Sequence, residues 1–459
     1  MTRVDELQKK YPSIPKEVIV KWEVVNSGVR DTDDLDKVSD WSGPGTTYQS
    51  YDHDVTLKDL AARRPNRLRA GSVLRPRRLH MKNGLYAGTR IDTRSPYGIR
   101  EVGEGAFALF EGEEKVDVDI YFPNMDAPAM GDVRTSKGTP ITQLVSPVGN
   151  CFRMMPVRYC EYFATGEQCK FCNFNSTHDD SRSVGIGRAV TINLDEAIEA
   201  YRILSADHQL LEGHFEMGGF KSSEHEGSIY VDFIEKIAGA ASYKPNLTII
   251  GEALERKDYQ RLKDAGLDCI TLQMEVWVPE LFSEVCPGKA KHMSHERWLD
   301  AFFDAVDVFG VGNVGGKIIA GLSLIPENGH KTWQEARDSQ IEGNTWMIKN
   351  GVFPIFTNLR LPPGSVYWDD KSLREKLPPT DYLLDVAQAH HQASMEYGLY
   401  PKLNRFMYCG LECLAGIYAG EIGILALAGD LGNWMADVVP DESNLLAQFV
   451  SSVKSPAKV

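Results

Sequence analysis

The sequence predicts an α/β protein built around a TIM-like (βα) barrel, partial or full, with an N-terminal β-rich domain and a C-terminal tail. At 459 residues the chain is long enough for a barrel plus additions. From residue 151 onward, short apolar runs alternate with helical patterns. Before that point, short alternating runs bounded by Gly, Pro and Asp are typical of antiparallel strands. We therefore expect a polar, β-rich domain over 1–150, the barrel over 151–400 and the tail over 401–459.

The first 150 residues change character near residue 70. Residues 1–60 are polar and charged, with a helical pattern over Ser13–Val25. Further on, alternating runs predict strands at Gly84–Ile91, Ala106–Leu109 and Val116–Phe122. A turn at Pro147–Asn150 is expected to end this part of the chain.

Six strand–helix units follow that turn. The strands are expected at Phe152–Tyr159, His214–Met217, Leu247–Ile250, Cys269–Val276, Lys317–Leu322 and Val352–Leu359. The helices are expected at Leu194–Leu204, Ile229–Ala241, Tyr259–Ala265, Glu296–Phe309, Trp333–Lys349 and Tyr382–Tyr397. Strands joined by helical crossovers form one parallel sheet, and chemistry in such barrels sits in the loops after the strands.

Charge and hydropathy restrict the class of partner. The formal net charge is −14, which argues against a protein that coats nucleic acid. The run Arg63–Arg78 holds seven arginines and can bind an anionic ligand or an acidic surface of the same chain; a solvated segment is the simpler interpretation. No apolar leader core and no stretch of about 18 apolar residues are present. We expect a soluble, cytoplasmic protein without membrane association.

Three thiols fall within thirteen residues directly after the first predicted barrel strand: Cys160, Cys169 and Cys172. Three cysteines can bind three corners of a cubane iron–sulfur cluster and leave the fourth iron without a protein ligand. A structural zinc site normally needs four protein ligands, and the nearest further candidate is His178. The alternatives to a cluster are a zinc knuckle and unconnected buried thiols.

The loop ends in Cys169-Lys-Phe171-Cys172 and resembles the signature of the radical S-adenosylmethionine (SAM) superfamily. The commonest family spacing puts three residues between the first two cysteines, whereas this chain has eight. The resemblance implies a (βα)6 barrel and a [4Fe–4S] cluster on the three thiols. It also implies that SAM chelates the open iron and is cleaved reductively to a 5′-deoxyadenosyl radical. Phe171 is then expected beside the cofactor, although an aromatic residue can also simply pack.

The second predicted strand ends in Glu216-Met-Gly218-Gly219-Phe220. In the superfamily a Gly-Gly-Glu sequence here contacts the methionine amino group of SAM, and bare glycines allow a close approach. Gly218 and Gly219 match this pattern, but Phe220 replaces the acid. Either a backbone carbonyl or a nearby acid, such as Glu216 or Glu224, takes its place. An ordinary Gly-Gly turn is the alternative.

Three further positions are candidate SAM contacts. Glu275 ends the fourth strand, where related enzymes use a carboxylate to accept the ribose hydroxyls. Ile318 lies in the fifth strand, in a segment loosely like the superfamily's apolar wall against adenine. Arg360 follows the sixth strand and can meet a carboxylate of SAM or of substrate. A strand that merely ends in an acid at the surface is the alternative for Glu275.

Cys409 and Cys413 lie after the last barrel element, and two thiols four residues apart can share one helical face. Either thiol can donate a hydrogen atom to a substrate radical, which makes both candidate catalytic residues. Alternatively, the pair binds an auxiliary metal site with help from Cys286, Cys151 or a histidine. A third interpretation is that both are packed where the tail folds back.

Taken together, the residues and the resemblance predict a radical SAM enzyme acting on a small-molecule substrate, and the barrel most resembles the biotin-synthase-like branch. Rearrangement, sulfur insertion and related bond chemistry stay open. A radical SAM methyltransferase and a non-catalytic zinc or iron–sulfur binding protein are the alternatives. The expected partners are an electron donor, such as flavodoxin or ferredoxin, and a second copy of the chain in a homodimer.

Overall fold

A seven-stranded sheet is the centre of the molecule. The computed structural model describes residues 1–38, 55–63, 78–81, 86–88, 90–122, 133–148, 151–184, 189–207, 212–241, 243–399 and 402–403. The sheet has the order β13-β12-β11-β10-β9-β8-β7. The strands are β7 (Val145–Val148), β8 (Cys151–Met154), β9 (Glu212–Glu216), β10 (Asn246–Gly251), β11 (Cys269–Glu275), β12 (Val314–Ala320) and β13 (Val352–Asn358).

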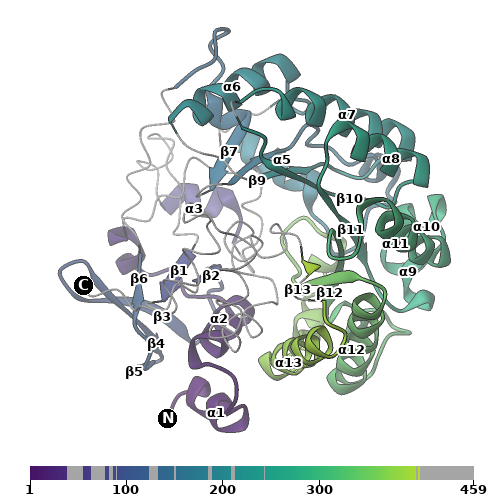
Figure 1. The fold of residues 1–459 in the computed structure, drawn as a ribbon. Helices are drawn as coiled ribbons and strands as arrows, with labels where there is room; N and C mark the ends of the chain where they lie inside the picture. Colours follow the sequence, from purple (N-terminus) through teal and green to yellow (C-terminus); the bar gives the residue numbers. More distant parts are fainter. Residues whose placement is uncertain are drawn as a thin grey trace.

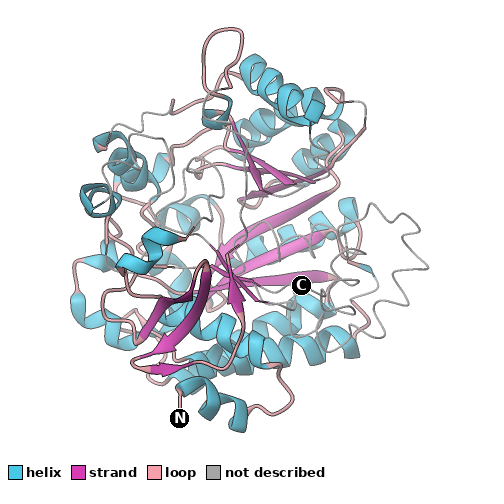
Figure 2. Ribbon diagram, turned by 90° about the vertical axis from the view of Figure 1, so that its left-hand side faces the viewer, coloured by secondary structure: helices cyan, strands magenta, loops and turns pink. Residues whose placement is uncertain are grey.

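Strands β8 to β13 are mutually parallel and adjacent in chain order, which confirms the predicted six-strand parallel sheet. β7 pairs antiparallel with β8. β7 and β13 form the two edges, so within the described residues the sheet is open and makes at most a partial barrel. Figure 2 shows the strands fanning across the molecule with the twist expected of such a sheet.

Helices cover the outer face of the sheet in a continuous arc (Figure 1). The long ones are α6 (Leu194–Asp207), α7 (Ser223–Ala238), α8 (Arg256–Ala265), α11 (His295–Phe309), α12 (Trp333–Lys349) and α13 (Thr380–Glu396). Shorter helices in the loops are α5 (Phe174–Ser183), α9 (Pro279–Val285) and α10 (Pro287–His292). Local signals explain several starts: Ser294 caps α11, and Thr332 with Glu335 forms a capping box at α12.

Several predicted boundaries shift by a few residues, and two of the errors involve proline. β8 ends at Met154 instead of Tyr159, since Pro156 has no N–H for the sheet ladder. The following segment pairs elsewhere, and Arg158 N donates to Val190 O at 2.7 Å. Pro147, expected in a turn, lies inside β7. An edge strand tolerates proline because one side of its backbone needs no partner.

The N-terminal part packs beside the last strand of the sheet, β13. It contains α1 (Arg3–Lys10), α2 (Lys16–Ser27), α3 (Leu57–Arg63), β1 (Arg78–Met81), β2 (Tyr86–Gly88), β3 (Tyr97–Gly103), β4 (Ala106–Glu111), β5 (Glu114–Lys115) and β6 (Ile120–Tyr121). The small sheets are β2-β1-β6 and β3-β4-β5. Trp22 of α2 stacks on Phe356 of β13 with ring centroids 5.5 Å apart, and one apolar cluster joins these elements.

The main core lies between the parallel sheet and the helical arc. Phe152, Phe215 and Tyr201 are fully buried in it, and such burial contributes roughly 1.5–3 kcal/mol for each large apolar side chain. This core packs against the outer face of the sheet. The carboxyl ends of the strands lie at one edge of the sheet, where polar side chains can be placed. Among the helices that the structure describes, none has the length and apolar character to cross a bilayer.

Candidate active site

The three-cysteine loop lies at the carboxyl end of β8. Cys160 is followed by a short 3-10 helix, Glu161–Thr165, which ends at Gly166 in the left-handed region with φ of 69°. Two contacts anchor the loop. Asn175 pairs with the Cys160 backbone, accepting from its N–H at 2.9 Å and donating to its carbonyl at 3.2 Å. Glu161 N donates to Gly219 O at 3.0 Å, which joins the loop to the end of β9.

The three thiols share one buried environment. Cys160 and Cys169 are each only 9% exposed, and Cys172 is partly buried. Burial, together with the neighbouring Cys169, raises the pKa of Cys160 to about 12. Burial, together with Cys169 and Cys160, raises the pKa of Cys172 as well. Thiols placed in this way stay protonated unless cations offset their charge, which is what metal binding provides.

Thiolates are donors for both iron–sulfur clusters and zinc ions. In the described ranges, no three His, Cys, Asp or Glu side chains are grouped to hold one metal ion. A tetrahedral zinc site would hold its sulfurs only about 3.8 Å apart, given a Zn–S distance of about 2.3 Å. Cluster ligands bind separate irons and therefore stand further apart. His178, the candidate fourth zinc ligand, is buried on α5 outside any such group.

Gly218 allows the end of β9 to touch the cysteine loop. A methyl group on Gly218 would lie 2.1 Å from the Tyr159 carbonyl oxygen and 2.6 Å from Cys160 N. Real Cβ atoms do not approach backbone atoms so closely. The glycine is therefore required by the contact itself, and a Gly-Gly turn alone does not explain it.

The acid that faces Gly219 is Glu252, which the sequence did not single out. A methyl group on Gly219 would lie 2.5 Å from Glu252 Oε1, and Tyr162 donates to Glu252 Oε2 at 2.8 Å. Glu252 follows β10 and contributes to the raised pKa of Cys160. Burial raises its own pKa. No local motif marks this residue. It comes close to Gly219 because β10, which precedes Glu252, pairs with β9, which precedes Gly219.

Neither acid suggested by the sequence contacts these glycines in the structure. Glu216 forms a buried ion pair with Arg153 of β8, inside the sheet. The Glu224 side chain is 71% exposed on α7, and its carboxylate lies 4.0 Å from the Lys257 ammonium. The prediction that a backbone carbonyl, Glu216 or Glu224 takes the place of the family's acid stays a prediction, and Glu252 is a further candidate for that role.

Glu275 ends β11 in an unusual conformation. Its φ of 72° makes it the only non-glycine residue with positive φ in the described part of the chain. It is 5% exposed, and its Oε2 atom is buried without a hydrogen bond in the described structure. Strained backbone and an unsatisfied buried carboxylate are costly, and both are typical of binding sites. Its position alone contradicts the alternative of a strand that simply ends in solvent.

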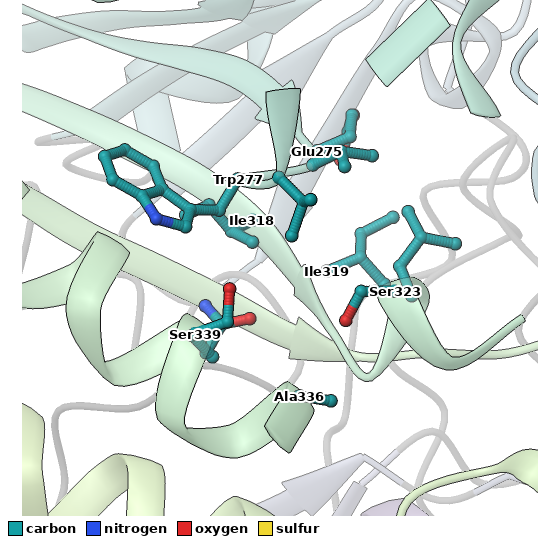
Figure 3. A pocket seen from close by; sticks show the side chains of 11 residues that line it. Glu275, Trp277, Ile318, Ile319, Ser323, Ala336 and Ser339 are labelled. Carbon is teal, nitrogen blue, oxygen red and sulfur yellow. The ribbon is translucent and has the colours of Figure 1, made fainter. Parts of the chain in front are cut away.

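Glu275 and Ile318 line one pocket (Figure 3). The two residues are register partners on β11 and β12, and Ile318 is 3% exposed. Trp277 and Val278 continue the wall after β11, and α12 closes the other side with Ala336, Ser339 and Gln340. The pocket thus combines an apolar wall with a carboxylate and a few neutral polar groups. Its volume is only about 10 Å³, which is the room of a single water molecule.

A buried lysine joins the two acids. Lys289 Nζ lies 3.7 Å from Glu275 Oε1 and 4.0 Å from Glu252 Oε1. Its neighbour Cys286 is fully buried, and burial together with the nearby Cys169 raises the pKa of the Cys286 thiol. The sequence suggested Cys286 only as a helper of the tail cysteines, and no motif marks Lys289. Both are brought to the cysteine loop by the segment after β11.

Of the remaining predicted residues, two are described by the structure and two lie outside the described ranges. Phe171 is partly buried and packs on the main core. Arg360 is buried just after β13 and donates to the Asn358 side chain, which itself donates to Val25 O at 3.2 Å. Arg360 is thus placed toward α2. Cys409 and Cys413 fall outside the described residues, as does most of the arginine-rich run.

Comparisons with known proteins give distant relatives. No family model matches the sequence. The bacteriochlorophyllide c C-7(1)-hydroxylase of Chlorobaculum limnaeum is 22% identical over 275 residues, covering 56% of this chain and 62% of that protein. Among solved structures, the [FeFe]-hydrogenase maturase HydG is 16% identical over 52% of this chain and 48% of its own, with a TM-score of 0.39. Methylornithine synthase PylB is 14% identical over 57% and 71%, with a TM-score of 0.38. TM-scores below 0.5 mark only partial overlap of the folds.

Proposed function

We propose that this chain is a radical SAM enzyme that binds a [4Fe–4S] cluster on Cys160, Cys169 and Cys172. In this proposal it cleaves SAM reductively and abstracts a hydrogen atom from a small-molecule substrate. One observation carries the proposal: two buried thiols, one partly buried thiol, two buried carboxylates and one buried ammonium lie after the strands of a six-strand parallel sheet. The position agrees with the rule that such folds place chemistry after their strands.

The chain's own residues bind, orient and exclude water. The cysteine loop holds the three thiols, and its contact with Gly218 keeps it against the sheet. When bound, the cluster and SAM supply a 5′-deoxyadenosyl radical by reductive cleavage of the sulfonium. The buried surroundings of Cys160 and Cys169 keep solvent from that reactive species.

SAM recognition is assigned to two acids. Glu252, beside Gly219, accepts from the methionine amino group in the role that the superfamily gives to an acid next to the glycine pair. Glu275 accepts from the ribose hydroxyls, and its register partner Ile318 faces the adenine. The buried Glu275 Oε2 atom has no hydrogen bond in the described structure, which suits a ligand that brings its own O–H groups.

For the substrate, the proposal extends only to the type of bond at which the reaction begins. The relative from Chlorobaculum limnaeum is named for hydroxylation of a bacteriochlorophyllide, a reaction at a carbon–hydrogen bond. We infer that this chain also begins its chemistry at a carbon–hydrogen bond of a small molecule. The chain spans only 62% of the length of that relative, so the tetrapyrrole itself is not carried over. A flavodoxin or ferredoxin is the proposed electron donor.

The direct test is anaerobic incubation of reconstituted, reduced protein with SAM. Methionine and 5′-deoxyadenosine are expected, formed slowly without substrate and faster with it. Iron and sulfide should each approach four per chain. S-adenosylhomocysteine as the main product would favour the methyltransferase alternative. One zinc per chain with no SAM cleavage would contradict the proposal and favour the non-catalytic binding protein.

Glu275→Gln is expected to weaken SAM binding by roughly tenfold to a hundredfold. The substitution keeps the shape but removes a charge-assisted hydrogen bond, worth roughly 1.5–3 kcal/mol. Equilibrium dialysis or calorimetry under anaerobic conditions measures the change. Glu280→Gln, on the exposed face of α9 a few residues further on, is the matched control. Equal SAM affinity in the Glu275 and Glu280 variants would remove Glu275 from the site.

The tail cysteines retain three proposed roles: hydrogen donor, auxiliary metal ligand and packing. Cys409→Ala and Cys413→Ala distinguish them. A hydrogen donor predicts intact SAM cleavage with loss or diversion of product, measured by mass spectrometry. A metal role predicts lost iron relative to the unmodified protein. Normal turnover with normal iron in both variants would leave packing as the remaining role.

A further inference from the structure

The segment between α9 and α10 is docked on the cysteine loop. Lys170 N donates to Val285 O, and Gly288 N donates to Glu167 O, both at 2.9 Å. The contact is so close that a methyl group on Gly288 would lie 2.4 Å from the Tyr162 ring. The segment after β11 is therefore held at a fixed place relative to the three thiols. A charged side chain on this segment therefore acts on the three thiols from a fixed distance.

That charge is Lys289. Its side chain is 6% exposed, and its Nζ donates to Gln273 O at 2.5 Å in addition to facing Glu275 and Glu252. An ammonium buried without partners would lose its proton, whereas two carboxylates and a carbonyl favour the charged form. The Nζ also lies 5.2 Å from the Trp298 ring centroid, a position that suits a cation.

The same ammonium is within electrostatic reach of the cysteine loop. Cys286 stands three residues before Lys289 and caps α10, between the two backbone bonds that dock this segment on Glu167 and Lys170. Cys169 and Cys286 are among the groups whose charge favours protonated Lys289. A low-dielectric surrounding strengthens such interactions compared with water. A cluster on Cys169 would therefore experience this positive charge in both of its oxidation states.

We propose that Lys289 is a positioning residue that raises the reduction potential of the cluster and holds the side chains of Glu252 and Glu275 in place for SAM. The inference rests on the proposed function. Reduction adds one negative charge to the cluster, so a fixed positive charge beside it stabilises the reduced form. The two carboxylates lie 4.0 and 3.7 Å from the same ammonium, which ties them to one place beside the cysteine loop.

The test is the midpoint potential of the cluster, measured by anaerobic redox titration with electron paramagnetic resonance. Lys289→Met is expected to shift the midpoint potential to a more negative value. Lys289→Arg keeps the positive charge, so its potential is expected to stay close to that of the wild-type protein. Lys291→Met is the matched control: it removes the same charge two residues further on, from a side chain that is 63% exposed. An unchanged potential in Lys289→Met with full iron content would overturn the proposal, as would an equal shift in the control.

A second pair of variants covers the case in which Lys289→Met does not fold, because it leaves two buried carboxylates unpaired. The double variant Lys289→Met with Glu275→Gln removes one charge of each sign. Its potential is expected to lie below that of Glu275→Gln alone, and equal values would overturn the proposal. Wild-type protein that binds no cluster would refute the proposed function itself. Wild-type protein that cleaves SAM but shows no Lys289 effect would refute only this inference.

Discussion

Replacing Cys160, Cys169 and Cys172 together by alanine is expected to abolish iron binding and reduce SAM cleavage to background. The three thiols are the donors of the proposed cluster, and no other cysteine lies in the same loop. Iron and sulfide analysis, the visible absorption band and the resonance signal of the reduced protein measure the loss. Cys269→Ala is the control, because it removes a buried thiol at the opposite end of β11. Full iron retention in the triple variant would contradict the assignment.

Single replacements refine this result. Each of the three alanine variants is expected to lose most of its iron. Loss in the Cys169 and Cys172 variants but not in the Cys160 variant would indicate another first ligand. The structure makes Cys286 a candidate, since it is fully buried in the segment that is docked on the cysteine loop. Cys151 begins β8, whereas the cysteine loop follows the far end of that strand, so its position is unfavourable.

Gly218→Ala is expected to lower SAM cleavage by more than tenfold, with a loss of stability of about 1–3 kcal/mol typical of overpacking. The added methyl would overlap the Tyr159 carbonyl and the Cys160 amide, so the loop has to move away from β9. A tenfold loss of rate corresponds to about 1.4 kcal/mol of transition-state stabilisation, a cost that a small displacement of the loop readily exceeds. Cleavage rate, iron content and the thermal midpoint are the measurements.

Gly239→Ala is the matched control for this substitution. Gly239 follows α7, has no atom within 4 Å of an added methyl and does not adopt positive φ. It tests the loss of glycine flexibility without the steric overlap. Wild-type cleavage in Gly218→Ala would show that the loop contact is unnecessary. Equal losses in both variants would show that the effect is not specific to the cysteine loop.

Local sequence determined the parallel sheet and the position of the cysteine loop within it. Strand and helix signals repeat along the chain, and α12 matches its predicted range of Trp333–Lys349. Such signals are local: apolar periodicity, caps and turn residues act over a few positions. Proline caused the errors at β7 and β8 because its effect depends on whether the strand lies at an edge, which a single segment does not reveal.

Only the tertiary structure decided which charged groups join the thiols. Glu252 comes from the loop after β10 and Lys289 from the loop after β11, yet both lie beside residues of the cysteine loop. Neither belongs to a recognisable motif, and Glu224, which stands closer in sequence to Gly219, points to solvent. Parallel strands bring their carboxyl ends to one edge of the sheet whatever the sequence distance between them. The sequence alone therefore determined where the site lies, whereas the lateral order of the strands decided which side chains complete it.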